Sequence, residues 1–306
     1  MLCIKDGDFV LDGRTVVTLG KFDGVHRGHR KLIDRAKRLA ITNNMRLAVF
    51  TFKVAEGFHY PYMDSRQITT FYERERIFDE LGADVLIEFP FDDEIADMEP
   101  LTFIEKILKE KLNAAFAVVG EDWRFGRGGE GTCDLLKASQ KIYGFEAVVL
   151  EKELHDGREI GSSWVRDEIS KGNMETASVL LGRPYTICGT VAHGDEIGRQ
   201  MGFPTINIIP DRDKLLPPNG VYTAKITMSD GEFYGITNVG VRPTVSKGRA
   251  VTAETHIFDF SKEIYGQEVA VRPIHFQRPE MKFQSREALI QQLEHDIEFA
   301  KAFFWK

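Results

Sequence analysis

The first half of the chain alternates short β-branched apolar runs with segments of helical periodicity, and this alternation restricts the fold most. The apolar runs are TVVTLG (15–20), RLAVFTF (46–52), ADVLIEF (83–89), FAVVGED (116–122) and EAVVLE (146–151). After the first run, helical spacing relates Leu32, Ile33, Ala36, Leu39 and Ala40, and predicts a helix over residues 30–40. Such alternation predicts an α/β domain in which helices cover both faces of a doubly wound parallel sheet.

The second half changes character after about residue 182. Its apolar runs are YTICGTVA (185–192), TINII (205–209), GVYTAKITM (220–228), EFYGITNVG (232–240), AETHIFDF (253–260) and EVAVRPIHF (268–276). Glycine and proline separate these runs, which predicts a small antiparallel β-barrel followed by an amphipathic C-terminal helix. A chain of 306 residues has room for two domains. We expect these domains to span residues 1–182 and 183–306.

Composition excludes several classes of protein. The chain is 42% hydrophobic and 28% charged, as in ordinary globular proteins. Its net charge of -7 argues against a broad basic surface, so we expect no nucleic-acid partner. The three cysteines have neither zinc-site nor disulfide spacing. No basic segment precedes an apolar stretch at the N-terminus, and no apolar run approaches 18 residues, which predicts a cytoplasmic protein without a membrane partner.

The segment TLGKFDGVHRGHRKL follows the first predicted strand and leads into its helix, where open α/β sheets bind ligands. Its glycines allow close approach of a phosphate chain, and two histidines flank Gly28 and can stabilise charge on a phosphoryl group. The candidate residues are Gly20, Phe22, Asp23, Gly24, His26, Gly28 and His29. The alternative is a tight turn with two solvated histidines. A Walker P-loop is excluded, because no GK[ST] follows.

Two further clusters follow predicted strands in this half. VVGEDWRFGRGGEGT contains Asp122 beside aromatic and arginine residues, a combination that suits a flat ring with a phosphate tail. EIGSSWVRDEI places Ser162 and Ser163 at a helix start, with Arg166 one turn later, which together predict an anion site. A stabilised turn and a simple helix cap are the respective alternatives.

The barrel half contains a second candidate site. HGDEIGRQMGFPTINI combines a loop containing Gly194, Gly198 and Gly202 with Thr205 and Asn207 on one face of a strand. A hydroxyl and an amide oxygen so placed can bind a hard cation such as Mg²⁺ together with nucleotide phosphates. Glu254 and His256 share another strand face, and Glu254 is a candidate general base. The alternative for Glu254 is an exposed edge residue.

These motifs resemble the prokaryotic bifunctional riboflavin kinase/FAD synthetase family. The similar segments are GKFDGVHRGH, GEDWRFG, IGSSWVR, LLGRPYTICGTVAHGDEIGRQMGFPTIN, GVYTA, NVGVRPTV, AETHIFDF and QRPEMKF. The resemblance implies an N-terminal FMN adenylyltransferase domain and a C-terminal riboflavin kinase domain. It further implies ATP as co-substrate, Mg²⁺ as cofactor, and riboflavin, FMN and FAD as substrates or products.

The resemblance also implies individual roles. His26 and His29 match the histidines that contact ATP phosphates, and Gly24 and Gly28 shape the turn. Asp122 matches a polar position near the nucleotide, and Ser162, Ser163 and Arg166 match the family's ISSTxxR motif. In the kinase half, Thr205 and Asn207 match the PTxN motif that binds magnesium and ATP phosphates. Glu254 matches the base that activates the ribityl 5′-hydroxyl.

Two departures from the family pattern keep alternatives open. IGSS stands where ISST is usual, and TFKVAEGF stands where the family continues as TFDPHP. A second reading is therefore a riboflavin kinase whose N-terminal domain has lost or changed its activity. A third is a flavin-binding regulator without turnover, which would not need Glu254. For the first half alone, the HxGH motif also fits a cytidylyltransferase of another phosphate ester.

Overall fold

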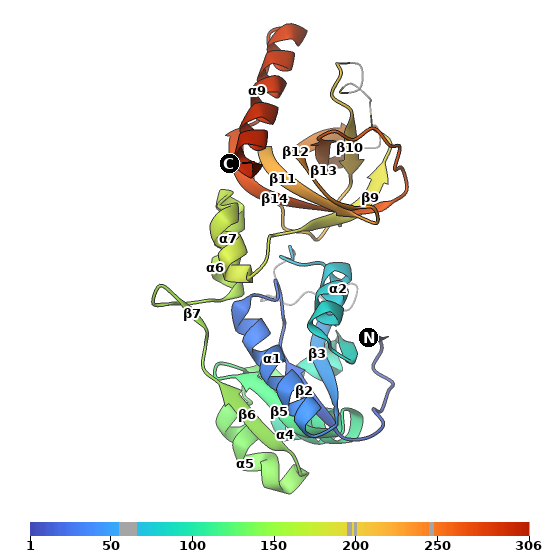
Figure 1. Ribbon diagram of the computed structural model, residues 1–306. Helices are drawn as coiled ribbons and strands as arrows, with labels where there is room; N and C mark the ends of the chain where they lie inside the picture. Colours follow the sequence, from blue (N-terminus) through green and yellow to red (C-terminus); the bar gives the residue numbers. More distant parts are fainter. Residues whose placement is uncertain (55–65, 195–197, 199–200, 245–247, 306) are drawn as a thin grey trace. The chain divides into compact units, whose positions relative to one another are not determined.

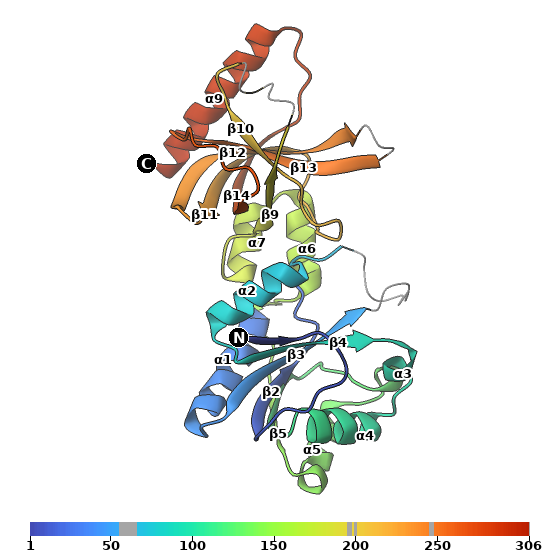
Figure 2. The ribbon, with the colours of Figure 1, turned by 90° about the vertical axis from the view of Figure 1, so that its right-hand side faces the viewer.

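The computed structural model describes residues 1–54, 66–194, 198, 201–244 and 248–305. Most of the departing segment after TFK therefore lies outside the described residues. The chain forms two compact units, drawn in Figures 1 and 2. The first unit comprises Met1–Ser65 and Phe71–Gly161, and the second comprises Arg66–Thr70 and Ser162–Lys306.

The first unit is built on a six-stranded sheet in the order β1-β4-β3-β2-β5-β6, in which every pairing is parallel. Its strands are β1 (Leu2–Ile4), β2 (Thr15–Leu19), β3 (Arg46–Val54), β4 (Val85–Phe91), β5 (Ala114–Gly120) and β6 (Glu146–Leu150), followed by the hairpin β7 (Leu154–His155) and β8 (Arg158–Glu159). Its helices are α1 (Arg27–Thr42), α2 (Phe71–Leu81), α3 (Asp93–Ala96), α4 (Pro100–Phe103), the π-helix η1 (Ile104–Lys111), the short 3₁₀ helix η2 (Arg127–Gly129) and α5 (Cys133–Tyr143).

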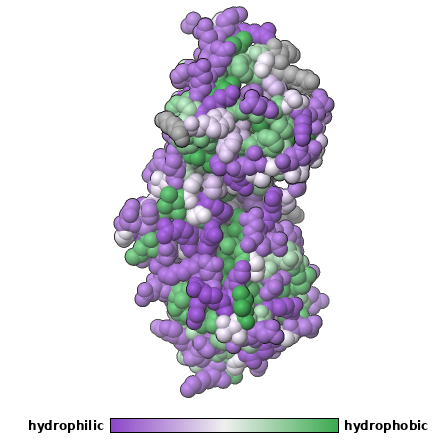
Figure 3. All heavy atoms as spheres, in the orientation of Figure 1, coloured by the Kyte–Doolittle hydropathy of each residue, from purple (hydrophilic) through white to green (hydrophobic). Residues whose placement is uncertain are grey.

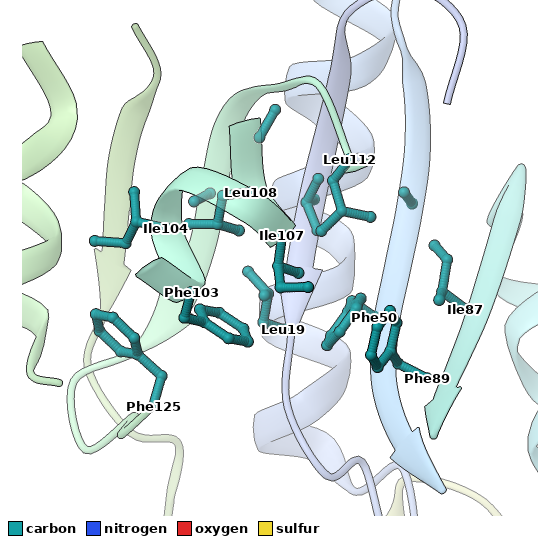
Figure 4. Close-up of a cluster of buried hydrophobic side chains, with 14 of the residues drawn as sticks. Leu19, Phe50, Ile87, Phe89, Phe103, Ile104, Ile107, Leu108, Leu112 and Phe125 are labelled. Atoms are coloured by element: carbon teal, nitrogen blue, oxygen red, sulfur yellow. The ribbon is translucent and has the colours of Figure 1, made fainter. Parts of the chain in front are cut away.

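Separate hydrophobic clusters cover the two faces of this sheet. Successive residues of a strand point to opposite faces, and accordingly Val16 packs with α1 whereas Val17 and Leu19 pack with η1 and α5. Figure 4 shows the second of these clusters, with Phe103 and Ile107 close to Leu19 and Phe50. The expected doubly wound parallel sheet is therefore confirmed. Strand β1 was not predicted, because three residues carry no readable periodicity.

The second unit contains a closed antiparallel barrel in the order β10-β13-β12-β11-β14-β9. Its strands are β9 (Ile187–Ala192), β10 (Thr205–Ile208), β11 (Gly220–Met228), β12 (Gly231–Thr244), β13 (Gly248–Ile257) and β14 (Glu268–Pro279), and its helices are α6 (Ser162–Lys171), α7 (Met174–Leu181) and α9 (Arg286–Phe304). In Figure 1, α9 lies against the outside of the barrel, where Leu293 and Ile297 pack on Val221 and Ile236. The expected barrel and its C-terminal helix are thus confirmed.

Helices α6 and α7 group with the barrel by their contacts, although they precede residue 183. Glu175 of α7 accepts a hydrogen bond from His275 of β14, and Gly172, between the helices, lies close to Phe276. Along the chain, the division between the compact units therefore falls between Gly161 and Ser162, about twenty residues before the boundary expected between the functional domains.

Hydrophilic and hydrophobic side chains are mixed over the face drawn in Figure 3. Within the part of the chain that the structure describes, no helix has both the length and the apolar character to cross a membrane.

Candidate functional sites

The turn after β2 lies where the order of the parallel sheet reverses. β3 and β4 extend the sheet on one side of β2, and β5 and β6 extend it on the other. Open α/β sheets bind ligands at this position, beyond the carboxyl ends of the strands. Phe22, Gly24 and Val25 all have positive φ, at 49°, 83° and 41°. For Phe22 and Val25 this conformation is unusual, and both side chains are fully buried in the cluster beneath α1.

His26 and His29 meet at the N-terminus of α1. His26 is the N-cap, and its Nδ1 accepts a hydrogen bond from the backbone N–H of His29 at 3.4 Å. The two rings stack with centroids 3.7 Å apart, and the Phe22 ring meets His29 edge-on. Gly28 keeps this arrangement open, because a Cβ there would lie 3.1 Å from His26 Cε1. Two imidazoles at a helix N-terminus can stabilise a bound phosphate.

Arg74 is a residue of this site that the sequence did not reveal. It lies in α2, is 4% exposed, and donates a hydrogen bond from Nη1 to the carbonyl of Lys21 at 2.9 Å. Thr51 donates to the same carbonyl. Burial lowers the pKa of Arg74, and Asp23, Glu88 and Glu73 oppose that shift. In the sequence, Arg74 is recognisable only as a charged residue on the buried face of a helix. That pattern does not predict its contact with Lys21, 53 residues earlier.

Asp122 follows β5, on the other side of the point where the sheet order reverses. It is largely exposed and forms an ion pair with Lys152, 3.2 Å between Oδ2 and Nζ. The neighbouring rings of Trp123 and Phe125 stack at 4.5 Å and pack against the hydrophobic cluster of Figure 4. These two rings therefore form part of the domain core.

Ser162 and Ser163 begin α6, and Arg166 follows one turn later; all three belong to the second unit. Arg166 donates a hydrogen bond to the carbonyl of Arg66, in the short segment 66–70 that belongs to the same unit. The hydroxyl groups and the guanidinium thus share one helix end, as the motif predicted.

The barrel brings the second set of motif residues onto one face. Asn207 of β10 pairs with Glu254 of β13, and Glu254 pairs with Asn238 of β12. One step along the same face, Thr205 pairs with His256. Directly paired residues of antiparallel strands share a face, so these side chains lie together. β13 lies between β10 and β12 in the closed barrel, so Glu254 is not on an edge strand.

Two cavities meet at Thr205 and Asn207. The larger has a volume of about 700 Å³ and lies between this face, residues 278–283 and α9, with Leu289, Leu293 and Ile297 on the α9 side. The smaller, of about 270 Å³, lies against Gly194 and residues 260–265. The larger volume is suited to a fused aromatic ring system. Thr205 and Asn207 thus stand where ligands of the two cavities would meet.

Asn207 has the character of a cation ligand. The residue is 7% exposed, and among the described residues its buried Oδ1 has no hydrogen-bond partner. Gly194 approaches its amide so closely that a Cβ there would lie 2.2 Å from Nδ2. Gly198 lies near Thr205, and Gly202 has a φ of +89°. A buried amide oxygen beside a threonine hydroxyl fits a hard cation.

His256 is held neutral beside Glu254. Its Nδ1 donates a hydrogen bond to the carbonyl of Pro204 at 2.9 Å, and burial lowers its pKa. Arg278, which also lines the larger cavity, forms a bidentate ion pair with Asp296 of α9, 2.6 Å from Nη2 to Oδ2. The sequence did not indicate that pair, because its residues lie on different elements.

Comparison with known proteins follows the same division of the chain. The family model described as FAD synthetase matches residues 10–164, and the one described as Riboflavin kinase matches residues 181–304. Proteins of Haemophilus influenzae and Listeria monocytogenes, both named bifunctional riboflavin kinase/FMN adenylyltransferase, are similar along nearly their whole length. The first is 37% identical over 98% of this chain and 97% of its own length, and the second 35% identical over 96% and 94%.

One solved structure that is similar to this chain has a name that mentions neither riboflavin nor FMN. The crystal structure of a protein from Streptococcus pneumoniae, called a macrolide-efflux protein, has a TM-score of 0.88 and 29% identity. The match covers 98% of this chain and 99% of that one.

Proposed function

The chain belongs to the bifunctional riboflavin kinase/FMN adenylyltransferase family, and on that premise we propose which of its residues make FMN and which make FAD. Both activities are supported, rather than the kinase alone, because both family models match and the bifunctional relatives extend along the whole chain. We assign adenylyl transfer to residues 1–182 and riboflavin phosphorylation to residues 183–306.

In adenylyl transfer, an oxygen of the FMN phosphate attacks the α-phosphorus of ATP, and pyrophosphate leaves. We assign His26 and His29 to the α-phosphate, where their N–H groups would stabilise the charge that develops during transfer. We assign the turn of Gly20, Phe22, Asp23 and Gly24 to the phosphate chain of ATP, and Arg74 holds that backbone through Lys21. Gly28 leaves room for the stacked imidazoles.

We also assign Asp122, Ser162, Ser163 and Arg166 to the binding of ATP. The serine hydroxyls and the guanidinium suit phosphate oxygens, and Asp122 suits the polar part of the nucleotide.

In riboflavin phosphorylation, we assign Glu254 as the general base. Its carboxylate would take the proton from the ribityl 5′-hydroxyl, whose oxygen attacks the γ-phosphorus of ATP while ADP leaves. His256, neutral at physiological pH, would not compete as an ion-pair partner for this carboxylate. The large cavity would hold the flavin ring against the apolar side of α9, and the smaller cavity would hold the nucleotide.

Magnesium fits the proposed site. Thr205 and Asn207 would hold the ion, with Gly194, Gly198 and Gly202 letting the loop pass close to the phosphates. The buried Oδ1 of Asn207, which no described residue satisfies, supports this assignment. When bound, Mg²⁺ neutralises charge on the phosphates of ATP.

The pairing of Asn207, Glu254 and Asn238 across three strands, beside two cavities, carries the assignment of the kinase site. Two variants test the division of labour. Glu254→Gln should abolish formation of FMN from riboflavin yet still convert added FMN to FAD, and His29→Ala should do the reverse. Glu294→Gln, on the exposed side of α9, is the matched control. Loss of both reactions in either folded variant would contradict the assignment.

A further inference from the structure

The large cavity contains a second carboxylate to which the reaction as described gives no role. Glu280 follows the end of β14 and lines the same cavity as Glu254. Its Oε1 accepts a hydrogen bond from Asn238 Nδ2, and its Oε2 accepts one from Asn219 Nδ2, both at 3.3 Å. Asn238 is also the strand partner of Glu254. One amide therefore stands between the two carboxylates.

The absence of a side chain at Gly240 leaves room for the Glu280 carboxylate beside β12. Gly240 lies two residues beyond Asn238 on the same face of β12, and a Cβ at Gly240 would lie 2.4 Å from Glu280 Oε1. The carboxylate therefore rests where a larger residue on β12 would displace it. Glu254, Asn238 and Glu280 together form a polar strip in the wall of the cavity, which the apolar residues Leu289 and Leu293 also line.

The strip has hydrogen-bonding capacity left for a ligand. A carboxylate offers about four lone-pair positions, and the bonds from Asn219 and Asn238 use two of them. The remaining positions accept hydrogen bonds and cannot donate them. Alcohol groups both donate and accept, so a carboxylate beside an amide is matched to neighbouring hydroxyls on one chain. A bare alkyl chain would leave these polar groups unpaired when it displaced their water.

We propose that Glu280, together with Asn238, binds the secondary hydroxyls of the ribityl chain and makes the kinase selective for flavins that carry a polyhydroxylated chain. This inference rests on the proposed function of the barrel. Glu254 acts on the terminal hydroxyl, and Glu280 recognises the hydroxyls between that group and the ring. Glu280 is thus a specificity residue, and the base remains Glu254.

The test compares two flavins. One is riboflavin, and the other carries a 5-hydroxypentyl chain at N10, so that it keeps the terminal hydroxyl and lacks the three secondary ones. Steady-state kcat/KM for phosphorylation is measured for the wild type, Glu280→Gln and the control Glu294→Gln. Glu280→Gln should lower kcat/KM for riboflavin about 10-fold and for the analogue less than about 2-fold, since only riboflavin loses a charge-assisted hydrogen bond.

Other outcomes distinguish failure of the role given to Glu280 from failure of the proposed kinase function. If Glu280→Gln lowers kcat/KM equally for both flavins, or for neither, Glu280 does not recognise the hydroxyls and the inference is overturned. If the wild type phosphorylates neither flavin, the proposed function itself fails. A second variant, Asn238→Ala, should also discriminate between the flavins. In the double variant with Glu280→Gln, the fold decrease in kcat/KM for riboflavin should be smaller than the product of the two single fold decreases. A decrease equal to that product would contradict a shared site.

Discussion

Replacing Gly194 with alanine should disable the kinase and spare the adenylyltransferase. The built Cβ would lie 2.2 Å from Asn207 Nδ2 and 2.7 Å from its Cγ. Asn207 is buried in a strand of a closed barrel, and the free space beside its side chain is that of the two cavities that it lines. The added methyl would therefore push the amide away from the position that we assign to a magnesium ligand.

The size of the effect follows from the overlap. Ordinary carbon contacts are about 3.5–4.0 Å, so the amide would have to move by about 1 Å or more. A displacement of that size in a site that positions reactants costs about 10²-fold in rate, equivalent to about 2.7 kcal/mol of transition-state stabilisation. Overpacking should also lower the free energy of unfolding by about 1–3 kcal/mol.

The assay follows both reactions in one preparation. Riboflavin is the substrate in one series and FMN in the other, and the second serves as an internal control for folded protein. Gly161→Ala is the matched glycine variant, since a Cβ there meets nothing within 4 Å. A Gly194→Ala protein whose kinase activity stays within about threefold of the wild type would refute the role given to Asn207.

Three further predictions concern other parts of the chain. Gly28→Ala, whose Cβ would lie 3.1 Å from His26 Cε1, should lower conversion of FMN to FAD about 10-fold and leave riboflavin phosphorylation unchanged; an equal loss of both would contradict the role of His26. Asp296→Asn should lower the free energy of unfolding in urea by about 3 kcal/mol, because it leaves Arg278 without its buried carboxylate, and a change below about 1 kcal/mol would argue against this role. Burial lowers the pKa of His256 below its usual 6.5. As the pH drops through about 6.5, His256 is therefore protonated in the unfolded chain before it is protonated in the folded one, and the free energy of unfolding decreases. The urea midpoint should therefore decrease less between pH 7.5 and 5.5 in His256→Gln than in the wild type, and equal decreases would count against the buried neutral imidazole.

The sequence predicted elements well where periodicity was long and uninterrupted. The strand expected over residues 220–228 coincides with β11 (Gly220–Met228), because glycine and a turn bound it on either side. Helix α1 begins at Arg27, three residues earlier than expected. Its N-cap is His26, and histidine is not a typical capping residue from which the start could be predicted. The grouping of α6 and α7 with the barrel was not readable, because it depends on contacts such as that of Glu175 with His275.

The sequence could group candidate site residues where they lie together in one motif. Thr205 and Asn207 were readable as one pair because alternate strand residues share a face, and their meeting with Glu254 follows from strand register. Arg74 and Glu280 were not found. Arg74 reaches Lys21 across 53 residues and Glu280 reaches Asn238 across 42, and local patterns do not specify such tertiary contacts.

The central claim, that one chain carries out two successive steps of flavin cofactor synthesis, is tested most directly by the order of its products. Purified protein is incubated with riboflavin, ATP and Mg²⁺, and the flavins are separated by chromatography over time. The account predicts FMN first and FAD afterwards, with FAD also formed when FMN is the starting flavin. Accumulation of FMN without FAD would contradict the assignment of the N-terminal site, and unchanged riboflavin would contradict the account as a whole.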